Sequence, residues 1–178
     1  MKHHLNIILL ALRLAIVYTA IEAIYQLVFA VFFFSVDGPE IVKEFFSDYF
    51  TPITKGTPYR NNEWFGAAFC ITHSGLLLYL TFGLKKLHKC LHQIKKGNLF
   101  YHTQGDELRK AGATIIIFAK SKYLLFCTMG TMVYIDLAIL FTEIPAFLAL
   151  YLLGKVILLM SHMAEKGEYI KEEIDLTI

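Results

Sequence analysis

Four ionisable side chains lie inside long apolar stretches of this sequence, where lipid would surround them: Glu22, His73, Lys120 and Lys155. Each stands about eight or nine residues from the nearest predicted membrane boundary, a rise of about 12 Å along a helix. An isolated charge near the middle of a bilayer costs about 2.5 to 3.5 kcal/mol on insertion scales. We therefore expect these groups to face inward and to form a polar seam between helices.

The chemistry of this seam has two interpretations. In the first it is structural, and Glu22 forms a salt bridge with Lys155 or Lys120 that holds helices together. In the second it is a small polar pocket or a path for protons or ions, because intramembrane ionisable groups often mark such sites. Gln26 shares the helix face of Glu22, whereas Lys122 points away from the face of Lys120 and should extend to the membrane surface.

No other set of residues has the spacing of an active site. His88 and His92 share a helix face but Cys90 points away from it, so we expect solvated side chains rather than metal ligands. The sequence contains no HExxH motif, no glycine-rich phosphate loop and no serine, histidine and aspartate order with informative spacing. We therefore expect no enzymatic activity, no metal and no cofactor.

Four apolar runs must position the seam, and they cover residues 5–36, 64–84, 112–135 and 144–163. About 20 helical residues span the hydrocarbon layer of about 30 Å, so each run is long enough to cross it. The first run is too long for the apolar part of a signal peptide and lacks a cleavage site. The expected fold is an all-α integral membrane protein, a single domain over residues 1–178 with four transmembrane helices.

The composition favours the same class. Hydrophobic residues make up 56% of the 178 residues and charged residues 18%, which is too apolar for a soluble domain of this length. The lipid bilayer is thus the first expected partner. The formal net charge of +2 provides no overall basic field of the kind that binds nucleic acid directly. The three cysteines show no paired spacing, so a disulfide framework is not expected.

The distribution of lysine and arginine predicts the orientation. Segment 85–110 contains seven of these residues, segment 37–63 contains three and the bend near 136–143 contains none. Because cytoplasmic loops carry an excess of them, segment 85–110 and both termini are predicted to be cytoplasmic. The outer segment includes an amphipathic stretch at 41–50 whose aromatic side chains are expected to lie along the membrane interface.

The segment between the second and third helices contains its own local signals. Residues 85–96 have an apolar stripe opposite the lysines, which predicts a basic helix lying at the membrane interface. Gly97 is expected to turn the chain. Thr103 and Asp106 have the form of a capping box, so the third helix is predicted to begin in water, ahead of the membrane.

The residues around this turn and at the end of the chain form two short patterns. The first consists of Lys96-Gly97, Phe100, Gln104, Leu108-Arg109 and Gly112; the second consists of Gly167, Tyr169-Ile170, Glu173 and Asp175-Leu176-Thr177-Ile178. They resemble the cytoplasmic signature and the closing pattern of the bacterial membrane proteins called domain of unknown function 2975. Tyr101 and Gln104 depart from the family pattern, which usually has Thr and Asn at these places.

What the resemblance implies is a multi-pass protein of the bacterial inner (cytoplasmic) membrane with four helices and no known activity. Relatives of that family are often encoded beside a small helix-turn-helix regulator, which makes such a regulator a candidate cytoplasmic partner. The resemblance supplies no catalytic residues.

Two functions remain open at this level. The first is a small regulatory or interaction protein that holds a cytoplasmic protein through its basic linker, 85–110, and its acidic tail, 165–178; the motif residues would otherwise only cap and orient helices. The second is a transporter or an ion-binding or small-ligand-binding component that uses the polar seam. Four helices are few for a complete transporter, so the second function implies a homo-oligomer.

The opposite charges of tail and linker, with Ile170 and Ile174 on one edge, predict that the tail packs on the linker.

Overall fold

The computed structural model describes residues 2–35, 37–50, 57–97, 103–135 and 137–177. Within these ranges the chain forms helices and no β-strand. The elements are α1 (Lys2–Phe32), α2 (Gly38–Tyr49), the 3-10 helix η1 (Pro58–Asn61), α3 (Glu63–Lys95), α4 (Gln104–Tyr134), α5 (Ala138–Thr142) and α6 (Ile144–Thr177). Four helical stretches are long and apolar enough to cross a membrane, namely α1, α3, α4 and α5 together with α6. The expected all-α fold with four helices that could span a membrane is confirmed, and their insertion in a bilayer stays a prediction.

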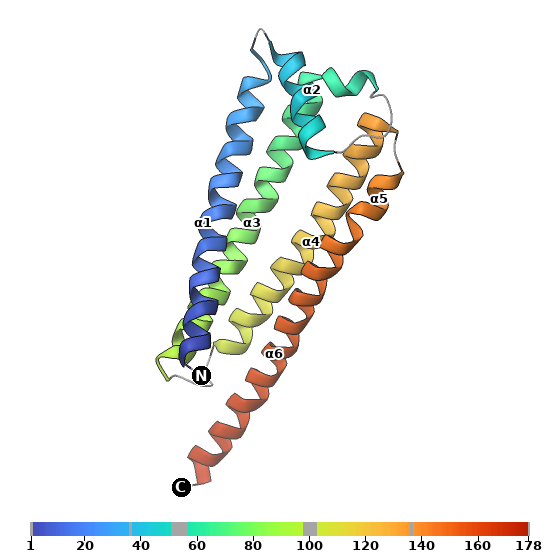
Figure 1. Ribbon diagram of the computed structural model, residues 1–178. Coiled ribbons are helices and arrows are strands. Elements are labelled where there is room, and N and C mark those ends of the chain that lie inside the picture. The colour runs from blue at the N-terminus through green and yellow to red at the C-terminus, as the bar shows by residue number, and fades with distance from the viewer. Residues whose placement is uncertain (1, 36, 51–56, 98–102, 136, 178) are drawn as a thin grey trace.

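The four long helices pack in chain order, α1 against α3, α3 against α4, and α4 against α6. Figure 1 shows them as a row, with α1 at one edge and α6 at the other. The two edge helices are accordingly exposed: 17% of the most apolar window of α1 is buried, against 56% for α3. Exposed apolar side chains of this kind suit lipid, which surrounds the edges of such a row.

Both termini lie at one end of the molecule and α2 lies at the other (Figure 1). We call these the terminal end and the α2 end. The end of α3 and the start of α4 also lie at the terminal end, as the predicted topology requires. The side of the membrane on which each end lies stays a prediction.

The basic residues 85–96 do not form a separate interfacial helix, and that prediction is wrong. They continue α3, which runs without a break to Lys95. Their apolar stripe is covered by protein, because Leu87 and Cys90 are buried together with Leu108 of α4. An apolar stripe of this width packs equally well on a helix or on lipid, and here the neighbouring helix covers it.

The turn and the start of α4 match the sequence in part. Gly97 has a positive φ of 92°, which only glycine adopts without strain, and α3 ends there. α4 begins at Gln104 with Thr103 as its N-cap residue, as predicted, but the side chain of Thr103 makes no capping hydrogen bond. Phe100, Tyr101 and the other residues of 98–102 lie outside the described part of the chain.

The tail is helical but does not fold back on the linker. α6 continues to Thr177 and extends beyond the other helices in Figure 1. Ile170, which was expected to pack on the linker, is 55% exposed, and Leu87 of the linker is already covered by the core. The side chain of Ile174 and residue Ile178 lie outside the described part.

The amphipathic stretch of the outer segment forms α2, as predicted, but its aromatic face does not lie along the membrane interface. Phe45, Phe46 and Phe50 are buried in the protein, at 5%, 0% and 3% exposure. Gly38 makes this possible, because a Cβ there would collide with the carbonyl oxygen of Phe33 where the chain reverses. α2 thus inserts its aromatic face between the helix ends, where an open row leaves room.

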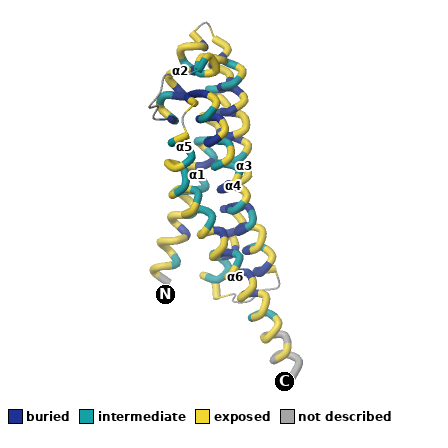
Figure 2. Tube along the Cα trace, turned by 90° about the vertical axis from the view of Figure 1, so that its right-hand side faces the viewer, coloured by how far each residue is buried: buried dark blue, intermediate teal, exposed yellow. Residues whose placement is uncertain are grey.

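The apolar interior consists of two clusters. The upper core, at the α2 end, is largely aromatic and includes Phe33, Phe46, Phe69, Phe126 and Tyr134. The lower core is largely aliphatic and includes Ala23, Leu77, Leu108, Ile115 and Ile157. In Figure 2 buried segments recur along the bundle, while most of the described residues at the projecting end of α6 are exposed.

The predicted orientation can be tested by cysteine labelling. Cys90 was the natural reporter of the linker, but Cys70, Cys90 and Cys127 are all buried, so new thiols are required and the wild-type protein is a silent control. We expect Glu44→Cys, on the exposed face of α2, to react with a membrane-impermeant maleimide in intact cells. Lys95→Cys should react only after permeabilisation, because lysine-rich ends face the cytoplasm. The reverse pattern would overturn the orientation.

Candidate functional site

A layer of polar side chains separates the two cores. Gln26 of α1, His73 of α3 and Lys122 of α4 each lie, along their helix, between residues of the lower core and residues of the upper core. Glu22 of α1 and Tyr49 of α2 complete the group. We call these five residues the polar layer. Because four different helices contribute to it, the layer is where the row and α2 are joined.

Glu22 receives two hydrogen bonds within this layer. The hydroxyl of Tyr49 donates to Glu22 Oε1 over 2.9 Å, and Gln26 Nε2 donates to the same oxygen over 3.1 Å. Gln26 Nε2 also donates to the hydroxyl oxygen of Tyr49. Burial and the hydrogen bond to Glu22 raise the pKa of the Tyr49 hydroxyl, which therefore keeps its proton and remains a donor. The carboxylate is stabilised by neutral donors rather than by an ion pair.

His73 lies beside this group in an aromatic setting. Its side chain is 5% exposed, and its ring centroid is 5.3 Å from that of Phe126 and 6.3 Å from that of Tyr49. Lys122 Nζ lies 4.9 Å from the Phe126 centroid. The layer therefore combines an acid, an imidazole and a half-buried ammonium across three helices.

Two buried atoms of the layer have no hydrogen-bond partner in the described part of the chain. They are His73 Nδ1 and Gln26 Oε1. A buried polar group without a partner costs about 1 to 3 kcal/mol. The layer is therefore not a fully satisfied network, and it has capacity for further hydrogen bonds.

The four-residue seam expected from the sequence is not assembled. Glu22 and His73 lie in the polar layer, but Lys120 Nζ and Lys155 Nζ stand 5.9 and 5.5 Å from the ring of Tyr151 instead. None of the ion pairs among the described residues joins Glu22 to a lysine. The reason is the row, which places α1 and α6 at opposite edges. Lys122 was expected to extend to the membrane surface, but it belongs to the polar layer, with its Nζ against the ring of Phe126.

Sequence reasoning missed Tyr49 because it lies in the segment treated as an outer loop. The signal was present, since Tyr49 follows Phe45 and Phe46 by four and three residues and so shares their helix face. That face is the buried face of α2. A phenol on the apolar face of an amphipathic helix needs a buried acceptor, which here is Glu22.

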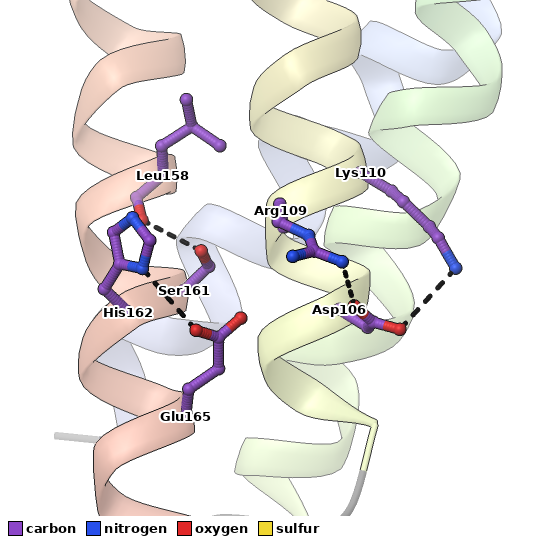
Figure 3. Close-up of polar contacts among 7 residues, drawn as sticks. All are labelled: Asp106, Arg109, Lys110, Leu158, Ser161, His162 and Glu165. Atoms are coloured by element: carbon purple, nitrogen blue, oxygen red, sulfur yellow. Dashed lines mark hydrogen bonds and ion pairs between the residues drawn. The ribbon is translucent and has the colours of Figure 1, made fainter.

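The residues of the two sequence patterns lie at the terminal end, where several of them pack helices together. Leu108 and Gln104 are buried, at 1% and 5% exposure. Arg109 is exposed and its guanidinium lies 2.8 Å from Asp106 Oδ1, with Lys110 Nζ 3.8 Å from the other carboxylate oxygen (Figure 3). Glu173 is exposed on the projecting part of α6, and the side chain of Asp175 lies outside the described part.

Gly112 and Gly154 mark the closest approach of α4 and α6. A Cβ on Gly112 would stand 2.9 Å from the carbonyl oxygen of Gly154, and a Cβ on Gly154 would stand 2.6 Å from Ile116. Two turns before Gly112 along α4, Gly105 similarly lies against the side chain of Glu165. Figure 3 shows the α6 residues of this contact, where His162 Nδ1 lies 3.5 Å from Glu165 Oε2. Gly112 is thus required because the close crossing of α4 and α6 leaves no room for a Cβ.

The fold and these sites define an all-helical protein with four potential membrane spans. Among the described residues no group of three histidine, cysteine or acidic side chains is placed to hold a metal ion. No family model, curated protein or solved structure matches the chain. The resemblance to domain of unknown function 2975 therefore stays a prediction.

The polar layer predicts which residue is coupled to Glu22. Tyr49→Phe should lower the free energy of unfolding by about 1 kcal/mol, because a buried hydrogen bond is lost. Combined with Glu22→Ala, it should cost less than the sum of the two single losses, with a coupling of at least about 0.5 kcal/mol. Equilibrium unfolding in mixed micelles would measure both. Lys155→Ala is the matched control, and its loss of unfolding free energy should add to that of Glu22→Ala. A coupling between Glu22 and Lys155 would instead support the salt bridge expected from the sequence.

The α4/α6 crossing predicts a contrast between two glycines. Gly112→Ala should destabilise the fold by about 1 to 3 kcal/mol, because its methyl group forces α4 and α6 apart. At Gly75, on an exposed face of α3, a Cβ would meet nothing within 4 Å. Gly75→Ala should therefore be neutral or stabilising by up to about 1 kcal/mol through helix propensity. Thermal unfolding in detergent would compare the stabilities of the two variants. Equal effects of Gly112→Ala and Gly75→Ala would contradict the close approach of α4 and α6.

Proposed function

We propose that this chain is a small multi-pass membrane protein that holds a cytoplasmic protein partner at the membrane through the projecting end of α6. The observation that carries the proposal is that α6 extends past the ends of the other helices (Figures 1 and 2). Tyr169 and Ile170 are 63% and 55% exposed there. Aromatic and branched apolar side chains on a projecting helix are the usual anchors of a helix that binds in a partner's groove.

One face of this helix already forms a shallow hollow. It is lined by residues from successive turns: His162, Glu165, Lys166, Tyr169 and Ile170. Glu165 rests against Gly105, so the hollow begins beside the start of α4 and continues along the projecting turns. An occupant would contact the membrane-embedded part and the projecting part together.

The charge of the projecting end selects the kind of partner. Residues 165–178 contain five acids against two lysines, so electrostatic complementarity favours a partner with a basic surface. A small helix-turn-helix regulator, the partner that the family resemblance implies, has such a surface because it binds DNA. On this proposal the chain acts in the bacterial inner membrane, performs no reaction and contacts no nucleic acid itself.

The polar layer supports this function over transport. Ion conduction through a seam requires connected polar groups, and Lys120 and Lys155 stand apart from Glu22 and His73. The layer instead ties α2 to three long helices. We assign it the role of holding the row together.

Affinity capture from detergent-solubilised membranes tests the proposal. The double variant Tyr169→Ala with Ile170→Asp should reduce recovery of the partner at least about tenfold, because it removes two exposed anchors. Both side chains point away from the core, so the unfolding temperature should stay unchanged. Glu44→Lys, an exposed change on α2, is the control and should recover the partner fully. Equal recovery with the double variant, or no specific protein with the wild type, would contradict the proposal.

A further inference from the structure

The terminal ends of α1 and α3 contain positive charge for which the described part of the chain provides few acidic partners. Residues 2–21 and 64–95 include no aspartate or glutamate. Arg13 of α1 contacts His88 of α3 there, and His92 stacks on His88. We call these residues, together with Lys85 and Lys86 on the neighbouring turn of α3, the α1/α3 basic patch. Of the neighbouring basic residues on α3, Lys89 is paired, with its Nζ 2.6 Å from Glu107 of α4.

Arg13 is the centre of this patch. Its Nε donates a hydrogen bond of 3.1 Å to His88 Nε2, which joins α1 to α3 and fixes the guanidinium. That bond uses one of the five N–H groups of an arginine. No acidic side chain in the described part pairs with it. The ring of His92 stacks on His88 at 6.1 Å, and the buried Nδ1 of His92 has no hydrogen-bond partner among the described residues.

The surroundings of Arg13 are those of a lipid-facing surface. It belongs to the potential membrane span His3–Phe32. Leu10, Leu14 and Val17, on either side of it along α1, are 58%, 63% and 55% exposed. A molecule that satisfies both the guanidinium and these apolar neighbours must combine an anion with hydrocarbon.

We propose that the α1/α3 basic patch binds the phosphate of an anionic membrane phospholipid, with the acyl chains lying along α1. The free end of the Arg13 guanidinium takes two phosphate oxygens in the bidentate arrangement typical of arginine. Lys85 and Lys86, both exposed on α3, add charge at the same end. The bond to His88 holds the guanidinium in place before the lipid arrives, which lowers the entropy cost of binding.

Delipidated protein in a neutral maltoside detergent provides the test. Its unfolding temperature, measured against added lipid, should rise with phosphatidylglycerol and much less with phosphatidylcholine. Arg13→Gln should weaken the apparent affinity for phosphatidylglycerol about fivefold, the effect expected for one basic side chain near an anionic surface. Lys43→Gln, which removes one exposed lysine from α2 at the other end, is the matched control and should leave that affinity unchanged.

Three results would overturn the assignment. The first is an equal response to the two lipids, and the second is an equal loss of affinity in Arg13→Gln and Lys43→Gln. The third is full stabilisation by sodium phosphate or glycerol phosphate alone, which would make the patch a site for soluble anions. If Arg13→Gln fails to fold by circular dichroism, Lys85→Gln replaces it, and the same fivefold loss is expected because Lys85 belongs to the patch.

Discussion

The half-buried carboxylate of Glu22 is the constraint on which the arrangement of this protein depends. A carboxylate inside a membrane must find donors within the protein, because neither water nor lipid supplies them. Gln26 lies one turn away on the same helix, but the second donor comes from Tyr49 of α2. α2 must therefore lie across the helix ends, and its Phe45 and Phe46 enter the upper core as a consequence.

The packing of the long helices follows from the solvent that surrounds them. Lipid is as apolar as leucine, so helices in a membrane gain little from burying hydrophobic surface and depend on close van der Waals contact. The row shows this at each crossing after the first: Gly83 of α3 faces Thr114 of α4, and Gly112 of α4 faces Gly154 of α6. At the α1/α3 contact, Ser74 donates to the carbonyl of Ala23 over 2.9 Å and Thr19 pairs with Thr81. Small and hydroxyl side chains thus form the closest contacts between neighbouring helices.

The sequence predicted the elements well and their surroundings less well. The four apolar helices, α2, the turn at Gly97 and the start of α4 next to Thr103 all follow from length, periodicity and turn chemistry. Periodicity identifies an apolar face but does not identify what covers it, so Leu87 and Phe46 were both assigned to the membrane surface when protein covers them. The same limit applies to the polar seam. Glu22 does not pair with the lysine of α6 because α1 and α6 are not neighbours, and periodicity does not reveal the order of the helices.

The row also determines how the two surfaces at the terminal end relate to one another. The α1/α3 basic patch lies on the side of α1 and the projecting end of α6 at the opposite edge, so a lipid and a protein partner bound as proposed would not compete for the same space. Any coupling between them passes through α3 and α4, where Lys89 and Glu107 form an ion pair whose lysine is 65% exposed. Exposed pairs of this kind contribute about 0 to 1 kcal/mol. The stronger connection is the buried contact of Leu87 and Cys90 with Leu108, so a shift of α3 relative to α4, rather than a change of surface charge, is the means by which one surface would affect the other.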